Sequence, residues 1–71
     1  MIEVFKTNVE SLIQAKYLQV LIQQHFFFTE VNFDLEDCDK VLRVKGEKIC
    51  TLNIILLMAA NGYECNVLEW A

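Results

Sequence analysis

The segment 30–45 constrains the fold of this chain more than any other. Its apolar residues alternate with polar ones before and after the polar group 36–39. This period of two is typical of strands with one buried face. A one-residue slip in the pairing would put the two apolar sets on opposite faces, so the pattern predicts a β-hairpin of defined register. With 36–39 as the loop, the predicted pairs are Phe33 with Leu42, Val31 with Val44, Asn32 with Arg43 and Glu30 with Lys45.

Upstream of the hairpin, the sequence predicts a short strand over 2–5 and then a helix that runs to about Gln24. Thr7 and Glu10 have the spacing of a helix capping box. His25 falls at the end of this helix, where the helix dipole favours a protonated imidazole. The helix carries two apolar stripes on opposite sides, so one is expected in the core and the other is either scattered surface residues or a partner surface. The stripes are Ser11, Ala15, Leu18 and Ile22, and Val9, Ile13, Tyr17 and Val20.

Downstream of the hairpin, the run from Glu47 to Ala60 predicts a second helix. Glu47 is placed near its N-terminus, as the helix dipole prefers, and Asn61-Gly62 supplies a left-handed stop. The final segment 63–70 reads as a strand. The expected core stripe of the second helix is Ile49, Leu52, Leu56 and Ala59. Because Cys50, Ile54, Ile55, Leu57 and Met58 are apolar too, we expect this helix to be either deeply buried or shared with another chain.

This order of elements predicts one α+β domain over 1–71 with a ferredoxin-like βαββαβ fold. Its four-stranded antiparallel sheet would have the order 4-1-3-2, with two helices on one face. An apolar cluster on the other face is either a dimerisation surface or a hydrated sheet face. The residues expected toward the helices are Ile2, Val4, Val31, Phe33, Leu42, Val44, Cys65 and Val67, and those expected on the open face are Phe5, Val41, Leu68 and Trp70.

With this length, this element order and a Gly62-Tyr63 step into the last strand, the chain resembles the heavy-metal-associated domain family. That family includes copper chaperones and the soluble metal-binding modules of P-type ATPases. Its Met-x-Cys-x-x-Cys loop, between the first strand and the first helix, holds Cu(I) or a similar soft ion. The matching stretch here is 5–10, with Thr7 and Glu10 where the cysteines belong. Because soft metals have little affinity for a hydroxyl and a carboxylate, the resemblance implies a metallochaperone-like domain with a degenerate metal loop.

The three cysteines leave a second hypothesis open. The expected topology places Cys38 and Cys65 near one end of the sheet and Cys50 at the other, so the first two could rebuild a site for Cu(I) or Zn(II). Cys38 lies among Asp34, Glu36, Asp37 and Asp39, whose charges attract cations but repel a thiolate. This segment lacks the glycine and glutamate of a calcium loop, so it is either a solvated acidic loop or a weak cation or redox site.

Composition restricts the class of function. A net charge of −4 and a pI near 4.7 argue against nucleic acid or an anionic membrane as partner. The start at Met1 has no signal-peptide pattern, and three irregularly spaced cysteines are typical of a reduced, cytoplasmic protein. A catalytic motif is not apparent, and Arg43, the one arginine, is expected on the sheet face. Because 55% of so short a chain is hydrophobic, we expect a non-catalytic interaction domain, either a homodimer or bound to a protein partner, with no cofactor.

Overall fold

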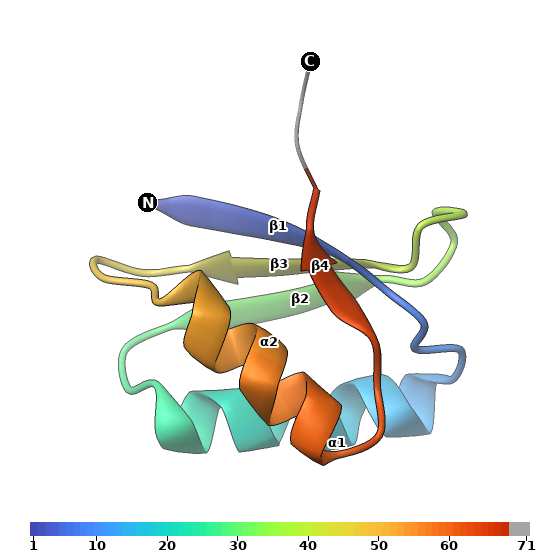
Figure 1. Ribbon diagram of the computed structural model, residues 1–71, viewed down its shortest axis with the longest axis horizontal. Coiled ribbons are helices and arrows are strands. Elements are labelled where there is room, and N and C mark those ends of the chain that lie inside the picture. The colour runs from blue at the N-terminus through green and yellow to red at the C-terminus, as the bar shows by residue number, and fades with distance from the viewer. Residues whose placement is uncertain (69–71) are drawn as a thin grey trace.

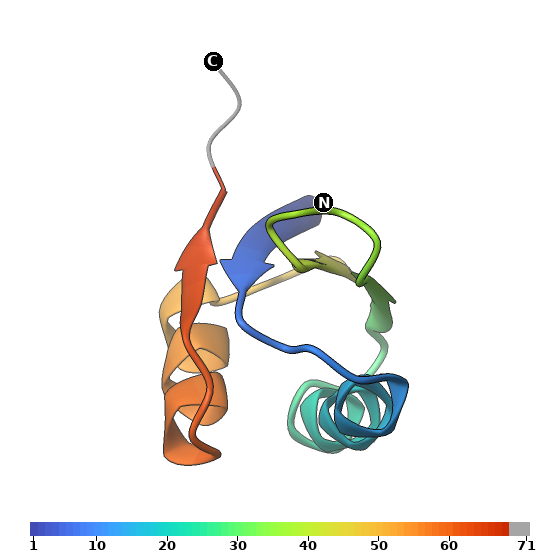
Figure 2. The same cartoon turned by 90° about the vertical axis from the view of Figure 1, so that its right-hand side faces the viewer.

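The structure is a computed structural model that describes residues 1–68. The elements follow the order β1 (Ile2–Thr7), α1 (Leu12–His25), β2 (Glu30–Asp34), β3 (Val41–Lys45), α2 (Thr51–Ala60) and β4 (Cys65–Val67). Every pair of neighbouring strands is antiparallel, in the order β2-β3-β1-β4, which reads β4-β1-β3-β2 from the other edge. Both helices lie on one side of the sheet (Figures 1 and 2). The predicted α+β class and the four-stranded antiparallel sheet with two helices are confirmed.

The hairpin of β2 and β3 has the predicted register. Phe33 pairs with Leu42 and Val31 with Val44, and the polar pairs Asn32–Arg43 and Glu30–Lys45 lie on the other face. The loop is longer than expected, because β2 ends at Asp34 and β3 starts at Val41. Inside the loop, Asp37 holds the turn: its carboxylate accepts the Asp39 N–H at 2.9 Å, and its carbonyl accepts the Lys40 N–H at 3.0 Å.

In strand β1, the side that faces the helices is the opposite of the predicted one. Phe5 pairs with Leu42 and is fully buried, whereas Ile2 pairs with Lys45 and is 59% exposed. The placements of Ile2 and Val4 toward the helices and of Phe5 on the open face were therefore wrong. Apolar residues occupy both phases of this strand, and the large ring of Phe5 removes more apolar surface from water when it faces the core.

Helix α1 begins later than predicted. Its N-cap is Ser11, whose hydroxyl accepts the Gln14 N–H at 3.1 Å while the Gln14 side chain accepts the Ser11 N–H at 3.3 Å. The capping box therefore lies at Ser11 and Gln14, and its prediction at Thr7 and Glu10 was wrong. Both pairs have the same spacing, and Thr7 belongs to β1. The helix ends at His25, as predicted.

Helix α2 begins at Thr51 with Cys50 as N-cap, so the prediction of a start near Glu47 was wrong. The predicted core stripe was also wrong: Ile54 and Met58 are fully buried, whereas Leu52 and Leu56 are more than half exposed. Apolar residues surround this helix on nearly every side, so their spacing does not define one face.

The C-terminus of α2 has the predicted left-handed stop. Gly62 has a φ of +87° and donates its N–H to the Ala59 carbonyl at 3.0 Å, and Tyr63 donates its N–H to the Met58 carbonyl at 3.0 Å. These two bonds form a Schellman motif, which satisfies carbonyls that the helix itself leaves free. The chain then enters β4, which covers Cys65–Val67; of the predicted strand 63–70, residues 69 and 70 lie outside the described residues.

One hydrophobic core joins the sheet to both helices. It lies between the helices and the sheet face that carries Phe5 and Leu42. Phe26, which follows α1, and Tyr63, which follows α2, pack against it from the two ends. The buried cluster contains Phe5, Val9, Ala15, Leu18, Ile22, Val31, Leu42, Val44, Ile54, Met58 and Cys65.

Candidate interaction surface

The apolar cluster predicted on the open sheet face does not form as expected. Phe5 is fully buried in the core, and Val41 is only 3% exposed although it lies on the face away from the helices. Leu68 is half-buried and donates its backbone N–H to the Val4 carbonyl at 2.8 Å. Trp70 lies outside the described residues. Because Phe5 and Val41 have almost no free surface, a partner cannot contact this cluster through them.

The stretch 5–10, which the sequence comparison placed at the metal loop of heavy-metal-associated domains, contains Thr7 in a structural role. Thr7 is 7% exposed; its hydroxyl donates to the Lys40 carbonyl and accepts the Val9 N–H at 3.2 Å. Glu10 is exposed, and only its backbone N–H bonds to Gln14, at 3.3 Å. The two side chains therefore do not act as a pair.

The cysteines named in the metal hypothesis occupy different environments. Cys65 is 4% exposed and belongs to the hydrophobic core, and its burial raises the pKa of its thiol to about 12. Cys38 is exposed in the hairpin loop, and Cys50 is exposed at the start of α2. Since a metal binds the thiolate, the burial that keeps Cys65 protonated opposes its use as a ligand.

The hairpin loop does gather potential ligand atoms. The carboxylates of Asp37 and Asp39 and the thiol of Cys38 lie within 4.8 Å of one another, and Cys65 is not part of this group. Asp37 accepts the Asp39 N–H, and the Asp39 carboxylate lies 3.6 Å from the Lys6 ammonium group. These contacts account for the loop without an ion, and exposed acidic groups of this kind are common on protein surfaces.

The exposed side of α1 is apolar. Ile13, Tyr17 and Val20 are 83%, 58% and 53% exposed, and their spacing places them opposite the buried Ala15 and Leu18. These three belong to the second stripe of the sequence pattern, whose fourth member, Val9, precedes the helix and is buried. An amphipathic surface helix needs one apolar side, so the second side is available for another contact.

The exposed side of α2 repeats the pattern. Leu52 and Leu56 are 60% and 56% exposed, and Ala59 is also exposed. At 100° per residue, these three positions lie opposite the buried Ile54 and Met58. We call the two outward stripes together the outer helical face; it consists of Ile13, Tyr17, Val20, Leu52, Leu56 and Ala59.

The two halves of the outer helical face approach each other at the C-terminal end of α2. The Tyr17 hydroxyl of α1 lies 3.5 Å from the Asn61 side-chain oxygen at the end of α2. Figures 1 and 2 show both helices on the side of the molecule away from the sheet. Lys16 is the one lysine, arginine, aspartate or glutamate in either helix. The outer helical face is therefore apolar and almost free of charge.

A second apolar feature is the turn between α1 and β2. Phe26 packs on the core, whereas Phe27 and Phe28 are 76% and 101% exposed. The Thr29 hydroxyl donates to the Phe26 carbonyl at 2.7 Å and helps to fix the turn. Phe28 has a φ of +63°, which is unfavourable for a bulky side chain.

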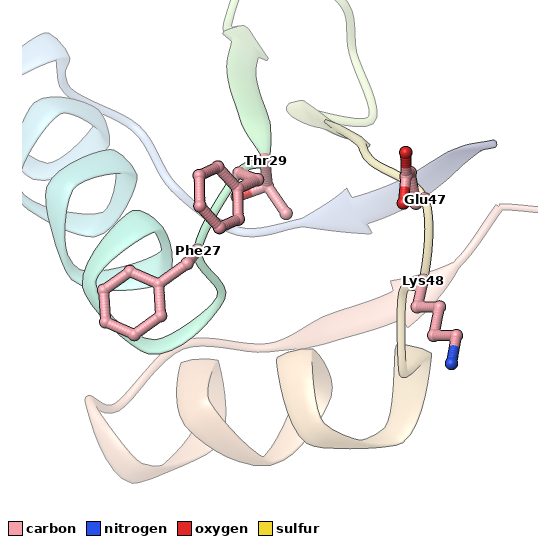
Figure 3. Close-up of a pocket in the computed structure, with 5 residues that line it drawn as sticks. Phe27, Thr29, Glu47 and Lys48 are labelled. Atoms are coloured by element: carbon pink, nitrogen blue, oxygen red, sulfur yellow. The ribbon is translucent and has the colours of Figure 1, made fainter.

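An open hollow of about 490 Å³ separates this turn from the segment before α2, and Glu47 and Lys48 line its other side (Figure 3). Phe27 and Lys48 extend away from each other rather than into a common centre. Small-molecule sites are mostly enclosed and carry convergent polar groups. The hollow is therefore a weaker candidate for a ligand site than the outer helical face is for a protein partner.

The sequence predicted the outward stripe of α1 as one of two alternatives, and it left open that α2 is shared with another chain. It did not predict which side of α2 faces outward, because Leu52, Leu56 and Ala59 were assigned to the core. Within residues 1–68, no helix is long and apolar enough to cross a membrane. No family model, curated protein or solved structure matches the chain.

Proposed function

We propose that this chain is a non-catalytic protein-interaction domain that docks through its outer helical face. In this proposal the fold is ferredoxin-like, and the domain resembles a heavy-metal-associated module in which the thiolate pair is missing. The order of the elements and the strand order β4-β1-β3-β2 support the comparison of folds. The hydrogen bonds of Thr7 support a structural use of the former metal loop.

The observation that carries the proposal is the lack of charge on an exposed apolar surface. A protein surface that only meets water usually has charged residues at about a quarter to a third of its positions. Across α1 and α2, Lys16 alone is of this kind, while Ile13, Tyr17, Val20 and Leu56 are each more than half exposed. Exposed apolar patches that are depleted in charge are typical of protein–protein interfaces.

The metal-binding alternative has less support than the interaction domain. It needs Cys38 and Cys65 to act together, but Cys65 is buried in the core and its thiol pKa is raised. The remaining group of Asp37, Cys38 and Asp39 is exposed or half-exposed and is already engaged with the backbone and with Lys6. A soft ion prefers two thiolates, which this loop does not offer.

The test compares two double variants that add the same charge at exposed positions. Ile13→Lys with Leu56→Lys places two lysines on the outer helical face, and Asn32→Lys with Asn66→Lys places two on the sheet. The two variants and the unmodified chain are each tagged and used to capture partners from the cells that express them. The captured proteins can include an untagged second copy of the chain.

We expect the helical variant to lose its captured proteins at least tenfold and the sheet variant to keep them. Circular dichroism must show that both variants are folded, because all four positions are exposed. Equal capture by the two variants would contradict the proposal, and so would loss of capture by the sheet variant alone.

A further inference from the structure

We propose that the occupant of the outer helical face is a second copy of this chain, related to the first by a two-fold axis. The inference rests on the proposed function and names the partner of the same surface. A two-fold interface uses the same patch on both subunits, so the patch must be compatible with itself. Charge, shape and area can each be compared with that requirement.

The distribution of charge selects the helical side. The chain has a net charge of −4, so two copies repel each other wherever their carboxylates meet. Within residues 1–68, every aspartate and glutamate lies on a strand or in a connecting segment, and none lies in α1 or α2. Two copies can therefore approach through their helices without placing acidic side chains opposite one another.

The exposed edge of the sheet is less suitable for a second copy. Strand β2 is an edge strand, and edge strands can pair with another chain through their free backbone groups. An antiparallel pair of β2 strands centred on Asn32 would place Glu30 of each copy opposite Asp34 of the other. Like charges directly opposite each other are destabilising, so this pairing works against itself.

The shapes of the two stripes suit each other. The stripe on α1 carries Ile13, Tyr17 and Val20, and the stripe on α2 carries Leu52, Leu56 and Ala59, with the same i, i+4, i+7 spacing. In a two-fold dimer, α1 of each copy can lie against α2 of the other, so that the bulkier stripe meets the one that ends in alanine. Ridges of one helix then pack into grooves of the other.

The available area indicates a reversible dimer. The five large side chains of the outer helical face, which are 53–83% exposed, offer on the order of 300–400 Å² of apolar surface. A weak specific interface buries about 600 Å² per partner, of which about 57%, or about 340 Å², is apolar. The surface therefore suffices for the low end of specific interfaces, and we expect weak, reversible association.

The experiment measures the mass of the intact chain by sedimentation and light scattering from about 1 μM to about 1 mM, a range that covers weak, reversible association. We expect the mass to rise from 8.3 kDa toward twice that value. Ile13→Lys and Leu56→Lys should each weaken association at least tenfold, and Asn32→Lys should leave it unchanged. Circular dichroism of each variant checks the fold.

A mixing experiment tests the contact between α1 and α2 of different copies. Ile13→Lys and Leu56→Glu should each be monomeric alone, since each buries an unpaired charge against the apolar stripe of the other copy. An equimolar mixture should recover a heterodimer, because the lysine of one copy can pair with the glutamate of the other. A folded pair of variants without any recovery would overturn the proposed arrangement.

The outcomes separate this inference from the proposed function. A wild-type chain that stays monomeric to about 1 mM, while its outer helical face still captures another protein, overturns the second copy and leaves the interaction domain standing. A dimer that the lysine variants do not weaken also overturns it. A monomer that captures nothing contradicts both proposals.

Discussion

The Thr7 hydroxyl donates a hydrogen bond to the Lys40 carbonyl and thereby joins the end of β1 to the end of the hairpin loop. The same connection includes a backbone bond from the Thr7 N–H to the Asp39 carbonyl, at 3.0 Å. The Thr7 hydroxyl also accepts the Val9 N–H, so one buried side chain forms hydrogen bonds with the hairpin loop and with the segment that leads to α1. Lys40 has a φ of +48°, and the bond to its carbonyl helps to hold this unfavourable conformation.

We expect Thr7→Val to lower the free energy of unfolding by about 1–3 kcal/mol, because it leaves the Lys40 carbonyl and the Val9 N–H without their partner. The two side chains have nearly the same shape, so the loss reports hydrogen bonding rather than packing. Urea denaturation measures it. Thr7→Ser is the control: it keeps the hydroxyl and should lose less than the valine variant. Equal stability of the valine variant and the wild type would contradict the role given to the hydroxyl.

The hairpin could be predicted from the sequence because two independent patterns agree in it. The alternation in β2 and the alternation in β3 each put their apolar side chains on one face. The two apolar sets share a face in the register that pairs Phe33 with Leu42. The end of α2 was predictable for a similar reason, since Gly62 tolerates the left-handed conformation that closes a helix. In both places, the conformation that the local sequence favours is also the one that the complete fold adopts.

Other parts of the fold were not predictable because the sequence offers two solutions of similar quality. Because β1 has apolar residues on both sides, its sequence does not show which side faces the core; the pairing of Phe5 with Leu42 decides it. Two capping-box spacings precede α1, and only the one at Ser11 lies outside the strand. In α2, apolar residues nearly all round the helix hide its core side, which is set by contact with the sheet. This is why Leu56 of the outer helical face was assigned to the core.

Burial of Cys65 predicts two classes of thiol. In the native protein, the exposed Cys38 and Cys50 should react with a thiol reagent, and the buried Cys65 should react only when the chain unfolds. The measurement is the rate of release of a chromophoric thiol with and without denaturant. Three thiols that react equally fast in the native protein would contradict the burial of Cys65.

The same thiol predicts a loss of stability in alkaline solution. Its pKa is about 12 in the folded protein, against an ordinary value of 9.0, so between these values the unfolded chain releases a proton that the folded chain retains. The stabilising effect is therefore complete below pH 9.0 and is lost as the pH rises toward 12, at no more than about 1.4 kcal/mol per pH unit. Cys65→Ala should be less stable at neutral pH but show a shallower decline from pH 9.0 upward. Parallel stability curves for the two proteins would contradict this assignment.

Metal titration should give no stoichiometric complex with Cu(I) or Zn(II) in the presence of a competing chelator. Cys65 holds its proton in the core, and the exposed group of Asp37, Cys38 and Asp39 has a single thiol. Native mass spectrometry of the reduced protein measures the bound ions. Cys38→Ser serves as the comparison, and its spectrum should match that of the wild type. One tightly bound ion per chain that is lost in Cys38→Ser would show that the hairpin loop is a metal site.

Phe28 combines an exposed ring with an unfavourable backbone, and its replacement should stabilise the protein. The side chain is 101% exposed, so removing the ring forfeits no burial, while its φ of +63° lies in the left-handed region that asparagine tolerates far better than phenylalanine. We expect Phe28→Asn to raise the free energy of unfolding by about 0.5–1 kcal/mol, as measured by urea denaturation.

Two neighbouring substitutions separate this backbone effect from a general effect of polarity. Phe27→Asn changes another exposed ring without the positive φ and should alter stability by less than about 0.5 kcal/mol. Phe26→Ala removes a ring that packs on the core and should cost about 2–3 kcal/mol. If Phe28→Asn is instead less stable than the wild type, the ring contributes to the fold. If it is more stable, the chain keeps a strained aromatic residue at its surface for a purpose other than folding, which is typical of a contact site.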